Sequence, residues 1–380
     1  MPTVLACCDS FKDTATADEV NQTIVSAIQD ATGMSASKIN MSDGGEGFVS
    51  ALQDAFNLSI VSVSVDGPLL SPITATYGLC EAKHLAVIEL AAAAGIESVP
   101  VELRNPLNTS TSGLGTLIKD AYEKGARSIL LGIGGSATND AGLGALQSMG
   151  LQIHTKHGLL NETFCGKHLA DVVDIVIPPE LEEMVKRLSI SVACDVTNPF
   201  VGGLGAVAVF STQKGAGAAI KMELERGMEN LARIIKHKFN VDVTDMSGAG
   251  AAGGVGGSFH ALLRAELKPG VELIADNLGL EDAIKAANVV FTGEGSYDSQ
   301  TAGGKVVSHV QKLCVKDMKP CIIVCGRNQM TETSHAAGTD LVWDLVSVYG
   351  KEQSMNNPCN SLQKLIESKK RDVISLIDDI

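Results

Sequence analysis

The stretch SILLGIGGSATNDAGLGALQSMG (residues 128–150) contains three successive patterns that together indicate one βα unit. An aliphatic run at 128–133 is typical of a buried strand, a glycine-rich polar loop follows at 132–142, and residues 140–149 have a helical pattern. Other strand-like runs lie at 3–8, 59–65, 86–90, 190–194, 289–293, 320–326 and 342–348. Helical patterns lie between them at 17–31, 47–56, 113–124, 216–236, 255–266, 301–316 and 359–371. This alternation predicts an α/β fold with parallel sheets.

Length and composition restrict the class of protein. At 380 residues the chain is long enough for two domains, and its 45% hydrophobic and 19% charged residues are typical of a soluble globular protein. The formal charge of −14 argues against a nucleic acid or an anionic membrane as partner. No signal peptide or membrane span is visible, and nine cysteines without metal-binding spacing indicate free thiols. We therefore expect a cytoplasmic protein.

Five polar loops each combine a carboxylate with glycine, an amide or a hydroxyl; four of them follow a predicted strand and one precedes a helix. The loops are CDSFK (8–12), SDGGEG (42–47), GIGGSATNDAG (132–142), CDVTNP (194–199) and GEGSYDSQT (293–301). In open α/β sheets ligands collect at the carboxyl ends of strands, and glycines let backbone N–H groups approach phosphate oxygens. Carboxylates would repel phosphate unless a cation such as Mg²⁺ lay between them. The repetition of the pattern favours phosphoryl transfer.

Single residues of these loops also have simpler interpretations. Asp9 and Asp43 are each compatible with a helix cap, and Asn198 before a proline is compatible with a turn residue. Lys214 in STQKGAG (211–217) is interpreted as a solvated surface lysine. Only the recurrence of the pattern at strand ends raises the loops above these interpretations.

Two other nucleotide-binding patterns fail or remain weak. TGEGSYDSQTAGGK (292–305) lacks the Walker pattern, because Ser299 stands where a glycine is needed and Val306 follows Lys305. GAGAAG (248–253) and GIGGSA (132–137) match dinucleotide-binding spacings, but neither opens an N-terminal βαβ unit. A nicotinamide site remains an alternative at 132–137, and close packing remains one for the glycines at 247–257. No GxSxG elbow is present, so a general base is expected to be a carboxylate.

Taken together, the loops resemble those of the class I, bacterial-type glycerate kinase family over nearly the full length. The matching segments are DSFKDTATA (9–17), SDGGEG (42–47), AAAAGI (91–96), TSTSGLG (109–115), GIGGSATNDAG (132–142), ACDVTNP (193–199), QKGA (213–216), GAGAAGG (248–254) and TGEGSYDSQTAGGK (292–305). The sequence departs from the family at Cys7-Cys8, at Ser42 and at Ser296, where the family often has arginine. If that arginine contacts phosphate or the substrate carboxylate, another cation must take its place, and the candidates are Lys12, Lys214, Lys305 and Arg104.

The resemblance implies phosphorylation of D-glycerate by ATP with Mg²⁺, most often at the 2-hydroxyl. It also implies a restriction-enzyme-like α/β domain formed by 1–65 and 289–380, with an inserted flavodoxin-like domain at 66–288. The alternatives kept are a Rossmann-type oxidoreductase of a 2-hydroxy acid and a catalytically silent sugar-acid-binding protein. The expected partners are small molecules, in a monomer or homodimer.

Roles are assigned to the matching residues as follows. Asp195, at a strand end, is predicted as the general base, and Lys12 as the contact of the transferred phosphate. Asp43 and Glu294 are predicted to hold Mg²⁺. The predicted substrate and nucleotide contacts are Asp9, Ser10, Gly44, Gly45, Gly134, Gly135, Ser136, Thr138, Asn139, Asn198, Asp298, Thr301 and Lys305.

Overall fold

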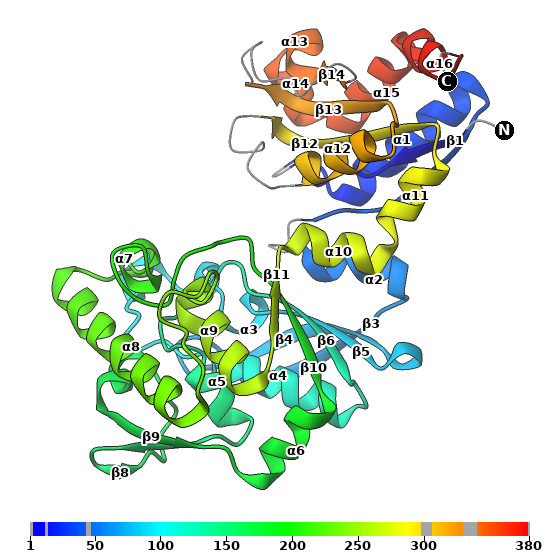
Figure 1. The fold of residues 1–380 in the computed structure, drawn as a ribbon. Helices are drawn as coiled ribbons and strands as arrows, with labels where there is room; N and C mark the ends of the chain where they lie inside the picture. The colour runs from blue at the N-terminus through cyan, green and yellow to red at the C-terminus, as the bar shows by residue number, and fades with distance from the viewer. Residues whose placement is uncertain (1–2, 12–13, 43–46, 298–305, 330–339, 379–380) are drawn as a thin grey trace. The chain divides into compact units, whose positions relative to one another are not determined.

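The computed structural model describes residues 3–11, 14–42, 47–297, 306–329 and 340–378. The chain forms two compact units, one made of residues 1–43 with 271–380 and the other of residues 44–270 (Figure 1). The predicted α/β class is confirmed: each unit contains a sheet with helices, the first sheet parallel and the second mixed. Among the described residues no helix is long and apolar enough to cross a membrane.

The unit boundaries differ from the predicted divisions at 65/66 and 288/289. The strand β3 (Ser59–Asp66) pairs antiparallel with β4 (Pro72–Cys80) and therefore belongs to the second unit. The turn between them is closed by a hydrogen bond from Gly67 N to Ser71 O. The proline-bearing turn predicted as a boundary is thus the turn of a β-hairpin.

The first unit contains a five-stranded parallel sheet in the order β14-β13-β12-β1-β2. Its strands are β1 (Thr3–Ala6), β2 (Ser35–Lys38), β12 (Val289–Tyr297), β13 (Cys321–Asn328) and β14 (Asp340–Asp344). Its helices are α1 (Ala17–Thr32), α10 (Gly270–Leu278), α11 (Leu280–Ala286), α12 (Val306–Lys316), α13 (Leu345–Tyr349), α14 (Lys351–Asn356), α15 (Pro358–Ser368) and α16 (Lys370–Asp378). Since the strands are parallel, the carboxyl ends of β1, β2, β12 and β13 lie at one edge of this sheet.

Alternation along β13 explains why this sheet is covered on both faces. Ile322 and Val324 belong to the core formed with α1, α15 and α16, whereas Ile323 and Cys325 pack with Val307 of α12. A strand that is buried on both sides has no polar alternation, and this is the aliphatic run seen in the sequence. The predicted strand at 342–348 is half wrong, because the Asp344 side chain accepts a hydrogen bond from Ser347 N and starts α13 there.

The second unit contains a mixed six-stranded sheet in the order β11-β10-β6-β5-β4-β3 and a small antiparallel sheet in the order β8-β7-β9. Besides β3 and β4, its strands are β5 (Leu85–Glu89), β6 (Ser128–Gly132), β7 (Gln152–Thr155), β8 (Gly158–Leu159), β9 (Val172–Val176), β10 (Ser189–Ala193) and β11 (Glu266–Lys268). Its helices are α2 (Phe48–Phe56), α3 (Ala91–Ala94), α4 (Ser112–Glu123), α5 (Leu143–Ser148), α6 (Pro179–Arg187), α7 (Ala206–Phe210), α8 (Ala218–Phe239) and α9 (Ala251–Leu263). β5, β6, β10 and β11 are parallel neighbours, so the loops after them share one edge.

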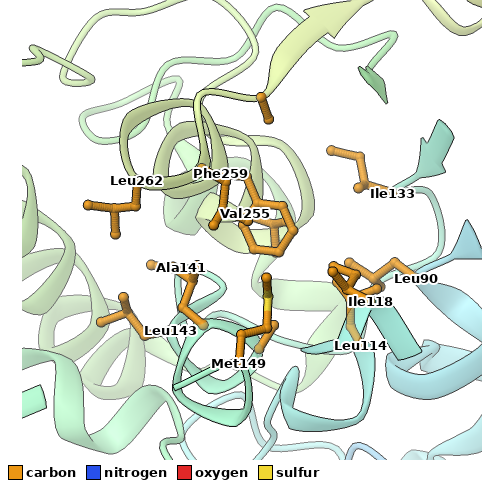
Figure 2. Packing of buried hydrophobic residues seen from close by; sticks show 14 of the residues in the cluster. Leu90, Leu114, Ile118, Ile133, Ala141, Leu143, Met149, Val255, Phe259 and Leu262 are labelled. Carbon is orange, nitrogen blue, oxygen red and sulfur yellow. The ribbon is translucent and has the colours of Figure 1, made fainter. Parts of the chain in front are cut away.

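The core of the second unit joins these loops to the helices behind them. Figure 2 shows Val255 and Phe259 of α9 among Ala141, Leu143 and Met149. All five side chains are less than 5% exposed. The end of the glycine-rich loop after β6 therefore packs against close-packed apolar side chains of α9.

Candidate functional site

One group of predicted site residues lies at the carboxyl edge of the first sheet. Asp9 follows β1, and its backbone N–H donates to Gly293 O at 2.9 Å, immediately before Glu294 in β12. Ser10 N donates to Asp9 Oδ1 at 2.6 Å. The sheet thus brings two carboxylate-bearing segments side by side, and carboxylate oxygens are the ligand type that Mg²⁺ accepts. The predicted residues Lys12, Asp43, Gly44, Gly45, Asp298, Thr301 and Lys305 lie outside the described residues.

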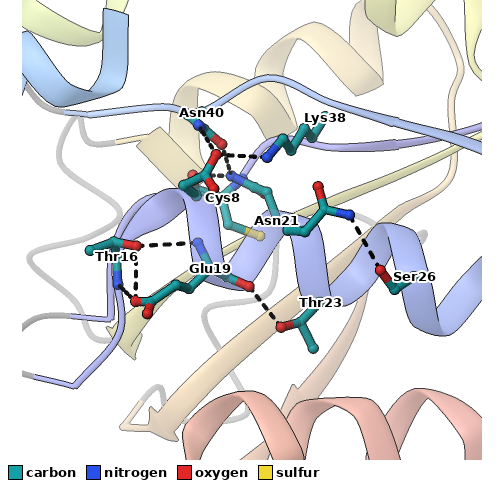
Figure 3. Close-up of polar contacts among 10 residues, drawn as sticks. Cys8, Thr16, Glu19, Asn21, Thr23, Ser26, Lys38 and Asn40 are labelled. Atoms are coloured by element: carbon teal, nitrogen blue, oxygen red, sulfur yellow. Dashed lines mark hydrogen bonds and ion pairs between the residues drawn. The ribbon is translucent and has the colours of Figure 1, made fainter. Parts of the chain in front are cut away.

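A buried asparagine on α1 ties together the loops that follow β1 and β2 (Figure 3). Asn21 is fully buried; its Oδ1 accepts from Cys8 N at 2.8 Å, and its Nδ2 donates to Cys8 O at 3.1 Å and to Asn40 Oδ1 at 3.2 Å. Asp18 in turn accepts from Lys38 Nζ at 2.6 Å and from Asn40 Nδ2 at 2.7 Å. These bonds lower the pKa of Asp18, with Lys38 the main cause. One side chain therefore positions the strand ends that precede Asp9 and Asp43.

We expect Asn21→Ala to lower the free energy of unfolding by about 1–3 kcal/mol, because the buried N–H and C=O of Cys8 lose their partner. The measurement is chemical denaturation followed by the fluorescence of Trp343, the single tryptophan, which belongs to the same core as α1. Gln22→Ala on the exposed side of α1 is the matched control. An Asn21→Ala midpoint equal to that of the control would contradict the positioning role.

The second group of predicted residues surrounds the loop after β6. Gly135 has a φ of +68°, which favours glycine, and the loop pairs with residues 94–96 through hydrogen bonds from Ile96 N to Gly135 O and from Ala137 N to Ala94 O. Ser136 Oγ accepts from Thr138 N at 3.1 Å. The loop therefore has a fixed shape, and the exposed backbone of 134–135 remains approachable.

The carboxylate of Asp140, which was not among the predicted site residues, connects this loop to the segment TSTSGLG (109–115). Asp140 is fully buried and accepts hydrogen bonds from Thr111 N and Thr111 Oγ1, both at 2.8 Å, and from Gly142 N and Gly144 N. Burial raises the pKa of Asp140, and these four donors oppose that rise. The ends of GIGGSATND and TSTSGLG are thus joined by one side chain. In the sequence, Asp140 is one of several polar residues of GIGGSATNDAG, and nothing singled it out.

Lys214 corrects the interpretation of a solvated lysine. Its side chain is buried, with only 3% of the residue exposed, and its Nζ donates to Thr138 O at 2.6 Å and to Ser136 Oγ at 3.2 Å. Burial lowers the pKa of Lys214 to about 7, while the charge of Asp140 opposes that shift. No periodicity marked this lysine, because it lies in a short turn between α7 and α8 and reaches back across the sheet edge.

Asn139 lies between Thr138 and Asp140 in the sequence, and its side chain is buried. Neither Oδ1 nor Nδ2 has a hydrogen bond to any other described residue. An unsatisfied buried amide costs about 1–3 kcal/mol, so such a group is expected where a ligand completes the bonding. This is the clearest mark of a binding function in the second group.

Asp195 and Asn198 follow β10 at the same edge. The Asp195 side chain is exposed, and its Oδ1 accepts from Gly270 N at 2.8 Å. Asn198 instead spans its own loop, with Nδ2 donating to Leu204 O at 2.8 Å and its backbone O accepting from Gly250 N. The geometry of Asp195 is compatible with the predicted base, whereas Asn198 has a clear structural role.

The glycines at 248–257 are packing residues. A Cβ on Gly250 would lie 2.2 Å from Pro199 O, and one on Gly253 would lie 2.1 Å from Thr138 O. Gly257 likewise faces the ring of Phe200. Of the two interpretations left open by the sequence, close packing is the one that these contacts support. Because they have no side chain, these glycines allow α9 to pack closely against the loops after β6 and β10.

The candidate residues therefore form two groups, one in each unit, and within each group the parallel sheet explains their proximity. Within the described ranges no three His, Cys, Asp or Glu residues cluster as metal ligands. Asp43 lies outside those ranges.

Comparisons with known proteins match nearly the whole chain. A model of the glycerate kinase family matches residues 4–378. The chain belongs to the glycerate kinase family. It is 41% identical to Glycerate 2-kinase of Escherichia coli (strain K12) over 350 residues, 90% of each chain, and 37% identical to Glycerate kinase of Halalkalibacterium halodurans over 98% of this chain and 97% of that one. A crystal structure described as a putative glycerate kinase 2 from Salmonella typhimurium LT2 aligns over 100% of both chains with a TM-score of 0.87 and 33% identity. The resemblance deduced from the loops is thus confirmed.

Proposed function

We propose that this protein is a cytoplasmic, ATP- and Mg²⁺-dependent D-glycerate kinase that forms 2-phosphoglycerate. The full-length likeness to glycerate kinases, including a relative named Glycerate 2-kinase, is the observation that carries this proposal. It is supported by the position of the family's loops, which follow β1, β2, β5, β6 and β10. Ligands of open α/β sheets collect at such strand ends.

We assign the following chemical roles to the residues of the two groups. Asp195 accepts the proton of the attacking glycerate hydroxyl, with its carboxylate oriented by the N–H of Gly270. Lys12 offsets the charge of the transferred phosphate, and the loop containing Gly134 and Gly135 offers backbone N–H groups to an anionic group. Asp43 and Glu294 would hold Mg²⁺, which would supply positive charge to the nucleotide phosphates.

The direct test is conversion of D-glycerate by the purified protein with ATP. We expect turnover only with Mg²⁺ or Mn²⁺, because carboxylates near phosphates need a divalent cation between them. Phosphorus NMR of the product distinguishes 2- from 3-phosphoglycerate. Undiminished turnover after EDTA treatment would contradict the metal requirement, and a 3-phosphoglycerate product would correct the position.

The same assay separates the other candidates. An oxidoreductase would change nicotinamide fluorescence with glycerate and leave ATP untouched. A silent binding protein would bind glycerate without consuming ATP. The packing of Gly250 and Gly253 against backbone disfavours a dinucleotide loop at 248–253.

A further inference from the structure

Lys214 is the single buried cation in the described part of the chain, and its surroundings do not neutralise it. Its Nζ donates to a hydroxyl and to a backbone carbonyl, both uncharged. Within the same described ranges no ion pair joins it to a carboxylate, and Asp140 acts on it only at longer range. An ammonium has three N–H donors, so one remains to be used.

Asn139, the residue after the carbonyl that Lys214 contacts, supplies unsatisfied donors. Lys214 Nζ is bonded to Thr138 O, the carbonyl of the peptide bond that joins Thr138 to Asn139. The carboxamide of Asn139 is fully buried, and its two N–H groups have no partner among the described residues. A cation and an amide with unused donors therefore flank one peptide bond of the loop after β6.

A purely structural role does not explain this pair. Burying an ammonium without a paired carboxylate costs free energy, so hydrogen bonds to two uncharged groups do not by themselves account for a lysine at this place. The amide of Asn139 contributes no hydrogen bond to the described part of the loop. The unused N–H donors of both groups are explained if a ligand with several acceptor oxygens completes their bonding.

We infer that Lys214 and Asn139 form a subsite for one oxyanion group, a carboxylate or a phosphate, of a ligand of this enzyme. Charge-assisted bonds from the ammonium and bonds from the amide would hold two of its oxygens. The identity of that ligand rests on the proposed function: the carboxylate is that of D-glycerate, or the phosphate is that of ATP.

The test uses two shape-conserving variants, Lys214→Met and Asn139→Leu, with Lys221→Met as the matched control. Lys221 on α8 also donates from Nζ to a backbone carbonyl, Ala208 O at 3.2 Å, but is not fully buried. Calorimetry on the intact protein measures the affinity for D-glycerate, for ATP with Mg²⁺ and for inorganic phosphate. Thermal unfolding without ligand checks the fold.

We expect Asn139→Leu to unfold at or above the wild-type temperature, and Lys214→Met to unfold at a lower temperature because Thr138 O and Ser136 Oγ lose their donor. Both variants should weaken the binding of one ligand by about 10- to 100-fold, the effect of a lost charge-assisted bond. A loss confined to D-glycerate identifies the carboxylate, and a loss confined to ATP and inorganic phosphate identifies the phosphate. Two folded variants whose affinities all stay within about twofold of wild type would overturn the inference. If Lys214→Met does not fold, Asn139→Leu alone decides, because it removes no bond present in the structure.

Turnover is measured separately on the wild-type protein. Lys214-dependent binding of an oxyanion without ATP consumption would refute the proposed function and leave this inference standing. If instead both variants consume ATP with D-glycerate as fast as the wild-type protein does, the proposed function stands and this inference is refuted.

Discussion

Asp195→Asn should lower kcat for D-glycerate by roughly 10²–10⁴, the usual contribution of a general base, while the affinity for ATP stays nearly unchanged. Asparagine has the size and shape of aspartate but cannot accept the proton of the hydroxyl. The structure adds that Oδ1 of the asparagine can still accept from Gly270 N, so the loop after β10 keeps its anchor. Loss of turnover would then report chemistry rather than a displaced loop. Steady-state kinetics with ATP and D-glycerate varied in turn gives both quantities.

The control for this variant is Asp245→Asn, which removes the same charge from an exposed position in the same unit. It should leave kcat within about twofold of wild type, as surface substitutions usually do. If Asp195→Asn instead weakens ATP binding with kcat unchanged, Asp195 is a binding residue. The base would then have to be sought at Asp9 or Asp298.

The fold was predictable wherever a strand is buried on both faces. The runs at 128–133 and 320–326 became β6 and β13 with shifts of a residue or two, because aliphatic strands between helix layers leave a strong pattern. β2, with the sequence SASK, was missed, since a half-exposed edge strand has no such run. The division predicted at 65/66 falls in a β-hairpin, because the turn at 66–71 connects β3 and β4, and composition does not distinguish such a turn from a linker.

The candidate site was predictable as a set of loops and less so as side chains. Glycines and polar residues after strands could be located by position alone, and Gly135 does have the left-handed backbone that its type suggested. The importance of Asp140 and Lys214 could not be deduced, because both depend on burial created by segments distant in sequence. Thr111 lies 29 residues before Asp140, and Lys214 lies 76 residues after Thr138. Burial of a polar residue is a property of the folded chain.

Gly253 packs tightly against the backbone of the loop after β6. Its φ is +69°, and the residues on either side, Ala252 and Gly254, are also left-handed, so the chain turns sharply into α9. A Cβ would stand 2.1 Å from Thr138 O and 2.8 Å from Asn139 Cα, and both are backbone atoms that cannot rotate away. The Gly253 carbonyl also accepts a hydrogen bond from Ala141 N. Any side chain here must push α9 away from the loop after β6.

We therefore expect Gly253→Ala to lower the free energy of unfolding by at least about 3 kcal/mol, the sum of a left-handed backbone cost of about 1–2 kcal/mol and a steric clash. Gly125→Ala is the matched control, since Gly125 has a φ of +97° with no neighbouring atom within 4 Å of the place a Cβ would take, and it should show the backbone cost alone. Denaturation followed by far-ultraviolet circular dichroism measures both variants. If the two lose equal stability, the contact of Gly253 with Thr138 is not tight and α9 does not support the loop. A larger loss in Gly253→Ala means that the loop carrying Ser136, Asn139 and Asp140 depends on this glycine for its position.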